Sequence, residues 1–169
     1  MRPVLTPWAS GPATTVSSSV VVSVTDFTSH RRRDLAGVAL VGLRLRMGWY
    51  AMPGAVGLWL WSLPLQARSG SISIWTSEED LRRFVGLPLH VEVMRRNARR
   101  GTVRATTWNT EEFVSSEVLD RARQWIVSKS DAPRQLVPAG AAGAGLIRWP
   151  ARGRRRRCRT VRRRDSRAP

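Results

Sequence analysis

The sequence predicts an α+β domain of βαββαβ order, with an antiparallel four-stranded sheet, over residues 17–130. Segments rich in β-branched residues alternate with helix-like segments in that order. The length of 169 residues fits one domain with tails. Outside the domain the composition turns to Pro, Ala, Gly and Arg without periodicity. We therefore expect a disordered N-terminal extension at residues 1–16 and a disordered Arg-rich C-terminal tail at residues 131–169.

The first half of the domain contains two strands around one helix. The β-branched run at residues 20–27 favours a strand. A helix over residues 35–49 follows, because apolar residues recur at helical spacing and Asp34 is the expected N-cap. The apolar run at residues 55–61 is short and bounded by turn residues, so it predicts the second strand.

The second half begins with a hairpin partner for that strand at residues 70–75. Thr76 and Glu79 then have capping-box spacing at the start of a helix. Proline cannot continue this helix, so a second short helix is expected over residues 88–100. A fourth strand and a last helix complete the domain, at residues 102–108 and 117–127.

Splitting each strand by its period of two predicts two faces of different character. One face is aliphatic and suits the helices; it collects Val22, Val24, Val56, Leu58, Leu60, Ile72, Ile74, Val103 and Ala105. The other mixes large rings, hydroxyls and one guanidinium; it collects Ser23, Thr25, Trp59, Trp61, Ser71, Ser73, Trp75, Arg104, Thr106 and Trp108. Four exposed tryptophans would form a larger apolar patch than monomers usually tolerate, so we expect this face to be covered.

A second copy of the chain, or the tail, is the expected cover. A homodimer would enclose a cavity with apolar walls and a few polar groups, the usual character of a ligand site. The substrate-binding candidates are then Trp59, Trp61, Trp75, Arg104 and Trp108. The rings would stack on a planar molecule and Arg104 would hold an anionic oxygen. The alternative is a plain aromatic interface without ligand, in which Arg104 pairs with an acid.

Of the two histidines, His90 is the candidate for catalysis. Its spacing to Val93, Met94 and Asn97 places these residues near one helical face. A neutral imidazole there can act as general base, and the alternative is a hydrogen-bonded structural residue. His30 lies in a basic loop and is expected to be solvated. The sequence contains no catalytic Ser-His-Asp pattern, phosphate-binding glycine loop or metal-ligand cluster, so no metal is expected.

Three stretches resemble the dimeric α/β-barrel superfamily: Pro53-Gly54-Ala55-Val56-Gly57, the run from Ser73 to Leu81, and Phe84 with Pro88 to His90. This superfamily includes the antibiotic-biosynthesis monooxygenases and the haem-degrading monooxygenases. The likeness covers residues 20–108. It implies a ferredoxin-like subunit, two of which pack sheet against sheet, with a pocket between sheet and helices.

The resemblance also implies two kinds of chemistry. Some members oxidise polycyclic aromatic substrates with oxygen and no added cofactor, and others bind haem through a helical His. In haem-degrading members an Asn on the first strand joins a Trp on the third strand and that His. Trp75 matches the Trp and His90 matches the His approximately, but Thr25 and Asp26 stand where the Asn is needed. We therefore expect no cofactor, with haem as the less favoured alternative.

Most of the formal net charge of +17 lies in the tail, where residues 131–169 contain 12 basic and 2 acidic residues. Such a segment can bind nucleic acid non-specifically by neutralising phosphates. Of the 29 basic residues all but Lys129 are Arg, which is typical of a GC-rich genome and explains the charge without a polyanion. A nucleic-acid partner is therefore not expected beyond non-specific association of the tail.

The remaining composition predicts a cytoplasmic protein. Cys158 is the single cysteine, so no intramolecular disulfide is expected. Residues 1–15 lack the apolar core of a signal peptide, and the most apolar stretch, residues 35–65, is interrupted by charges and prolines. We expect no membrane partner.

The leading functional hypothesis is a monooxygenase-like protein that binds or oxidises a hydrophobic, aromatic small molecule. If the chain is an enzyme, Trp75 and Arg104 place the substrate and His90 transfers a proton. The alternative is a non-enzymatic ligand-binding or structural dimer of the same fold. A third hypothesis is nucleic-acid association through the tail.

Overall fold

The computed structural model describes residues 2–13 and 19–128. The long strands are β3 (Val20–Ser29), β4 (Ala55–Leu63), β5 (Arg68–Trp75) and β6 (Gly101–Thr110). The helical elements are α1 (Asp34–Met47), η1 (Trp49–Ala51), η2 (Pro64–Gln66), α2 (Glu78–Val85), α3 (Pro88–Asn97) and α4 (Ser115–Val127). The long strands lie in the order β4-β5-β3-β6, and neighbours are antiparallel. The fold is therefore the predicted ferredoxin-like α+β arrangement.

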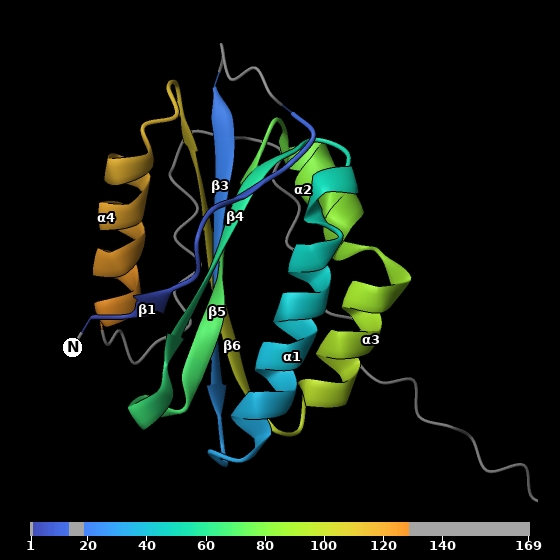
Figure 1. Cartoon of the computed structure of the whole chain (residues 1–169), viewed down its shortest axis with the longest axis vertical. Helices are drawn as coiled ribbons and strands as arrows, with labels where there is room; N and C mark the ends of the chain where they lie inside the picture. Colours follow the sequence, from blue (N-terminus) through green and yellow to red (C-terminus); the bar gives the residue numbers. More distant parts are fainter. Residues whose placement is uncertain (1, 14–18, 129–169) are drawn as a thin grey trace, which may run out of the picture. The chain divides into compact units, whose positions relative to one another are not determined.

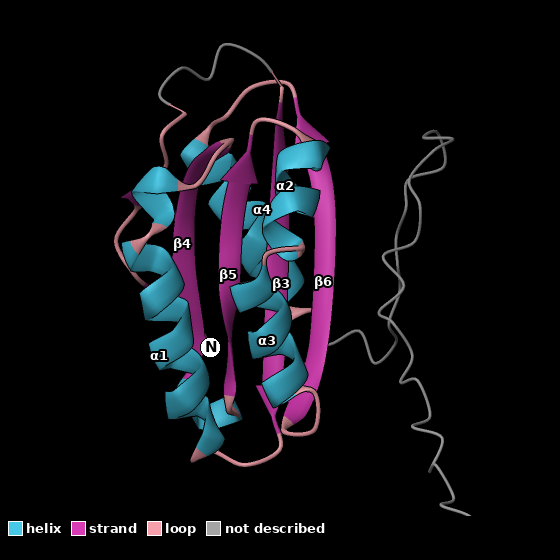
Figure 2. Ribbon diagram, turned by 90° about the vertical axis from the view of Figure 1, so that its right-hand side faces the viewer, coloured by secondary structure: helices cyan, strands magenta, loops and turns pink. Residues whose placement is uncertain are grey.

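The sheet is the middle layer of three (Figure 1). Helices α1, α2 and α3 lie on one side and α4 lies on the other, and Figure 2 shows the first three in front of the strands. We call the two sides the α1–α3 face and the α4 face. Each face has its own cluster of buried apolar residues, so α4 adds a second core to the ferredoxin-like unit.

Strand β3 lies at the centre because its valines are buried on both sides. Val22 and Val24 are 0% exposed on the α4 face, and Val21 is 5% exposed on the α1–α3 face. The strand pairs with β5 on one edge and β6 on the other. A strand covered on both faces is a continuous apolar run without alternation, and the run of three valines at residues 20–22 fits this position.

Both predicted helix starts are shifted by one residue. Asp34 is not the N-cap of α1 but its first helical residue, and the residue before it makes no side-chain cap. Ser77 caps α2 in place of Thr76, because its hydroxyl accepts from the Asp80 amide at 3.2 Å. The Asp80 carboxylate in turn accepts from the hydroxyls of Ser77 and Thr76 at 2.7 and 2.8 Å. Asp80, and not Glu79, therefore stands three residues after the capping residue, and its carboxylate binds hydroxyl groups of the cap.

The predicted division into an aliphatic face and a tryptophan-bearing face is wrong. Trp59 lies opposite Ile72 and Trp108 opposite Val22, so both rings share the α4 face with aliphatic residues. Trp75 lies on the α1–α3 face. The period of two determines which residues of one strand share a face, but not how the faces of different strands match. A register shift near the start of β4 changes its phase further.

Residues 2–13 belong to the fold, which corrects the expectation of a disordered extension for this part of residues 1–16. Two short strands pair with the outer edge of β4: β1 (Val4–Leu5) and β2 (Ala9–Ser10). Between them, the Trp8 ring lies against Trp59 and Phe113 on the α4 face, with centroid separations of 4.2 and 5.7 Å. The segment therefore contributes a large side chain to the core.

Two further predictions concern the C-terminal tail and the membrane. The expected Arg-rich tail, residues 131–169, lies outside the described residues. Within the described ranges, no helix is both long and apolar enough to cross a membrane.

Gly57 makes room for the Trp8 ring. A methyl group at this position would overlap with the indole. Gly57→Ala is therefore expected to push Trp8 off the sheet and to lower the free energy of unfolding by about 1–3 kcal/mol, measured by urea denaturation. The control is Gly37→Ala in α1, where a methyl group meets nothing within 4 Å; it should leave stability unchanged or raise it by up to ~1 kcal/mol. Equal behaviour of the two variants would show that Trp8 does not occupy this place.

Candidate functional site

The structure separates the four tryptophans that the sequence assigns to one pocket. Trp61 and Trp59 are 2% and 7% exposed on the α4 face. Trp108 is half-buried on the same face, with the Arg121 guanidinium 4.6 Å from its ring centre. Trp75 is fully buried on the opposite face. The prediction that these rings line one pocket is therefore wrong, and each packs against other parts of the same chain.

The α4 face has its cover within the chain. Val118, Ala122 and Ile126 of α4 are buried against it, and Trp8 and Phe113 complete the layer. A second copy is not needed to shield the tryptophans here. Pairing with a second copy stays a prediction, but these rings no longer argue for it.

Arg104 pairs with an acid, the alternative that the sequence left open. Asp26 is 0% exposed and accepts from Arg104 and from Arg68 at 2.6 Å each. Arg68 also donates to the Ile126 carbonyl at 2.6 Å, and the Arg104 guanidinium lies 4.7 Å from the ring centre of Trp125. The two cations thus fasten the C-terminal end of α4, where free carbonyls favour positive charge. Arg104 belongs to the structure of the α4 face.

On the α1–α3 face, four rings form an aromatic cluster. Trp49 packs edge-on against Trp75, with 5.1 Å between ring centres, and Phe84 contacts both. His90 extends the cluster, its ring centre 4.9 Å from that of Phe84. The Trp75 indole donates to the Ser73 hydroxyl at 2.9 Å. Sequence reasoning missed Trp49, which it placed at the end of a helix; the glycine before it was the available signal for a turn into the core.

His90 is held with one ring nitrogen occupied. Its Nδ1 lies 3.1 Å from the Val85 carbonyl. A carbonyl only accepts hydrogen bonds, so Nδ1 carries the hydrogen and the neutral ring has its lone pair at Nε2. Burial lowers the pKa of His90 below its ordinary value of 6.5, and the hydrogen bond to Val85 opposes this effect more weakly. Near neutral pH the ring is therefore uncharged and able to accept a proton at Nε2.

The lowered pKa of His90 predicts a pH-dependent stability. The unfolded chain takes up a proton at about pH 6.5 and the folded chain only at lower pH, so unfolding becomes easier as the pH falls below about 6.5. The stability that neutral His90 provides is complete above that value. We expect the wild type to lose stability relative to His90→Gln by at most about 1.4 kcal/mol per pH unit between about pH 6.5 and pH 5.5. Urea denaturation of both proteins measures this, and parallel pH profiles would contradict it.

A row of hydroxyl side chains crosses the centre of the α1–α3 face. It consists of Ser23, Thr25, Ser69, Ser71 and Ser73. The Thr25 and Ser71 hydroxyl oxygens lie 2.8 Å apart. They belong to the central strands β3 and β5, yet both residues stay partly exposed. The helices on this face therefore leave the middle of the sheet accessible.

Helices α1 and α3 cover this face without burying any side chain of their own. Gly42 of α1 faces β4, where an added methyl group would lie 3.5 Å from the Leu60 side chain, an ordinary contact distance. The half-buried apolar residues of the two helices include Leu35, Val38, Val41, Leu45, Val91 and Met94. Apolar walls above a few hydroxyls are the usual composition of a small-molecule site. Sequence reasoning missed this pairing because it grouped the hydroxyls with the tryptophans.

The set of residues that the resemblance implies for haem degradation is incomplete. His90 and Trp75 both contact Phe84 and thus belong to one cluster. No residue of β3 is an Asn: Thr25 lies on this face, and Asp26 points to the other face and is held by two arginines. These residues do not fit haem degradation. Within the described part of the chain, no three His, Cys, Asp or Glu side chains are placed to hold a metal ion.

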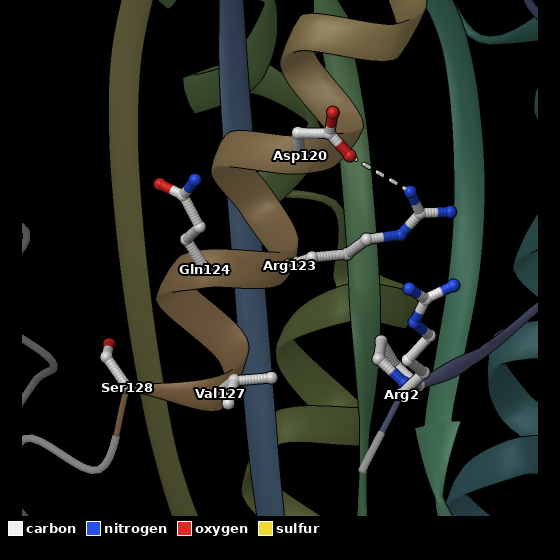
Figure 3. A pocket seen from close by; sticks show the side chains of 7 residues that line it. Arg2, Asp120, Arg123, Gln124, Val127 and Ser128 are labelled. Atoms are coloured by element: carbon white, nitrogen blue, oxygen red, sulfur yellow. Dashed lines mark hydrogen bonds and ion pairs between the residues drawn. The ribbon is translucent and has the colours of Figure 1, made fainter.

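A hollow of about 730 Å³ lies beside α4 (Figure 3). Its lining consists of Arg2, Pro3, Asp120, Arg123, Gln124, Val127 and Ser128. Arg123 is paired with Asp120 at 3.1 Å, and the lining contains no aromatic ring. The hollow holds none of the candidate residues, so it does not suit a planar aromatic ligand.

No protein-family model matches the chain, and no curated protein matches its sequence. Several solved structures are similar to it. SnoaB, a cofactor-independent oxygenase from Streptomyces nogalater, is 19% identical with a TM-score of 0.48, over 57% of this chain and 98% of that chain. LmHde, a heme-degrading enzyme from Listeria monocytogenes, is 16% identical with a TM-score of 0.44, over 61% and 68% of the respective chains.

A putative monooxygenase from Lactobacillus acidophilus is 10% identical with a TM-score of 0.49; the match covers 62% of this chain and 48% of that one, so the chain spans about half of its length. At these identities the likeness concerns the fold. The family resemblance drawn from the sequence motifs therefore stays an expectation. By its strand order and the placement of α1 to α3 on one side of the sheet, the chain has a ferredoxin-like α+β fold.

Proposed function

We propose that the chain is a monooxygenase-like protein that binds a hydrophobic, aromatic small molecule on the α1–α3 face and oxidises it. The observation that carries this proposal is the Thr25–Ser71 hydroxyl pair, which stays partly exposed at the centre of the sheet. It lies on the face that α1 and α3 cover without burying a side chain. A planar ligand there would contact apolar helix side chains and exchange hydrogen bonds with the two hydroxyls.

His90 supplies the proton acceptor in this proposal. Its Nε2 lone pair is available because Nδ1 is committed to Val85. Removing a proton from a phenol or from an activated CH2 group raises the electron density of the ring, which prepares it for oxidation. When one O2 oxidises a CH2 group to a carbonyl, one oxygen atom enters the product and the other leaves as H2O. The substrate therefore supplies all the electrons that reduce O2. No cofactor enters this balance.

The test is a titration of the purified protein with polycyclic phenols and anthrones, followed by tryptophan fluorescence and by oxygen uptake. The double variant Thr25→Val/Ser71→Ala should weaken binding by about thirtyfold, since two hydrogen bonds worth about 1 kcal/mol each are lost. Its matched control is Thr106→Val, which removes a half-buried hydroxyl on the α4 face and should bind as the wild type does.

His90→Gln separates binding from chemistry. It should leave the dissociation constant close to the wild-type value and lower the rate of oxygen uptake by about 100-fold or more. Binding without oxygen uptake in the wild type would favour the non-enzymatic alternative, a ligand-binding protein of the same fold. Equal binding by the double variant and by Thr106→Val would remove the α1–α3 face as the site.

A further inference from the structure

Helix α1 carries an apolar stripe on its outer side. Leu40, Leu43 and Met47 are 64%, 45% and 69% exposed, and their spacing of three and four residues places them on one side of the helix. Tyr50, just beyond the helix, is 74% exposed. We call these four residues the α1 stripe. Apart from Asp34 at its start and Arg44 and Arg46 in its last turn, α1 is apolar, yet it buries no side chain in this chain. We therefore expect the α1 stripe to be an interaction site, covered by something other than the described residues.

Exposed arginines lie at the start of helix α1, ahead of the α1 stripe. Arg31, Arg32 and Arg33 directly precede α1 and are exposed. Backbone contacts join this loop to the turn after α3, because the His30 amide donates to the Arg100 carbonyl at 2.8 Å. The exposed residues of that second basic segment are Arg95, Arg96, Arg99 and Arg100. Among the described residues, Arg96 alone of these seven arginines has an ion pair, with Glu92.

From these two features we infer that the chain binds the surface of an anionic lipid bilayer through α1. The α1 stripe enters the boundary between headgroups and acyl chains, and Arg31 to Arg33 contact lipid phosphates. An exposed apolar helix side with flanking basic residues is the usual composition of such a contact. Tyr50 fits the same boundary, where rings with one polar end are favoured. This differs from the expectation, drawn from the sequence, of no membrane partner, and it concerns a surface contact without a spanning helix.

The observations favour lipid over the other possible covers. A second copy packed on the α1 stripe would bring two sets of arginines together, whereas α1 and α3 contain one acidic residue each, Asp34 and Glu92. A nucleic acid would satisfy the arginines and leave the α1 stripe in water. A bilayer with anionic headgroups accommodates both features. The inference does not depend on the proposed ligand site, because no residue of the α1 stripe belongs to it.

The experiment is co-sedimentation of the full chain with phosphatidylcholine vesicles and with vesicles in which part of that lipid is phosphatidylglycerol. We expect binding to the second kind only, weakened by added salt. Leu40→Ser/Leu43→Ser should lower the vesicle affinity by at least tenfold, whereas Leu65→Ser, at an exposed leucine in η2, should not. Replacing Arg31, Arg32 and Arg33 with Gln should lower it on the order of a hundredfold, since each basic residue contributes about fivefold.

Three results would overturn the inference. Vesicle binding that survives both sets of substitutions would assign it to another part of the chain, such as the Arg-rich tail. Light scattering that gives twice the chain mass for the wild type and a single mass for Leu40→Ser/Leu43→Ser, without vesicle binding, would make the α1 stripe an interface between copies. Duplex DNA binding that depends on Arg31 to Arg33, without vesicle binding, would make it a nucleic-acid surface.

Discussion

Asp26→Asn is expected to lower the free energy of unfolding by about 3–5 kcal/mol. Asp26 is fully buried, and its two oxygens accept from Arg68 and Arg104. An amide keeps the shape but removes the charge, and its NH2 group faces donors. Two guanidinium groups that are only 11% and 26% exposed would then lack their counter-charge. Loss of one partner from a buried charged pair is costly because the remaining charge stays poorly solvated.

Urea denaturation followed by tryptophan fluorescence measures this effect, with Asp120→Asn as the control. Asp120 pairs with Arg123 at 3.1 Å on the outside of α4, where the two side chains are 68% and 43% exposed. Its loss should change stability by no more than about 0.5 kcal/mol. A similar, small effect at both positions would mean that the buried cluster does not hold α4 on the sheet.

Trp75→Ala is likewise expected to lower the free energy of unfolding, by about 3–5 kcal/mol. The ring is 0% exposed and packs against Trp49 and Phe84. Alanine would leave a cavity in the smaller of the two cores and remove the hydrogen bond to Ser73. Trp75→Phe keeps most of the volume and should cost about 1–2 kcal/mol.

Thermal and urea unfolding of Trp75→Ala and Trp75→Phe measure these losses of stability. Tyr50→Ala is the control. Tyr50 is 74% exposed, so its truncation should stay within about 0.5 kcal/mol of the wild type. A near-neutral Trp75→Ala would show that the aromatic cluster is loosely packed and that its rings are available to a ligand.

The elements of this fold were predictable from the sequence, and the relation between them was not. The strand at residues 20–27 and the last helix were recognised because β-branched runs and helical spacing act locally. The two faces were mismatched because Trp59 and Val22 lie on different strands, and nothing within either strand sets their relative phase. The short strands β1 and β2 were missed, since two-residue pairings at a sheet edge leave almost no pattern in a Pro-containing segment.

The candidate site was predicted only in part for the same reason. His90 was recognised as the titratable residue of a helix, and the structure places it beside Phe84 with Nε2 uncommitted. Arg104 was assigned to a ligand because its partner Asp26 is 78 residues away in the chain. Contacts of such separation follow from strand register, which single-sequence patterns do not specify.

The placement of α4 and residues 2–13 has a thermodynamic consequence. Because one chain alone completes the hydrophobic layer over the second side of the sheet, the shielding of this side adds no association term to the folding equilibrium. As far as this side is concerned, dilution should therefore leave the melting temperature unchanged. A protein whose tryptophans were sheltered by a twin would instead melt earlier the more dilute it became.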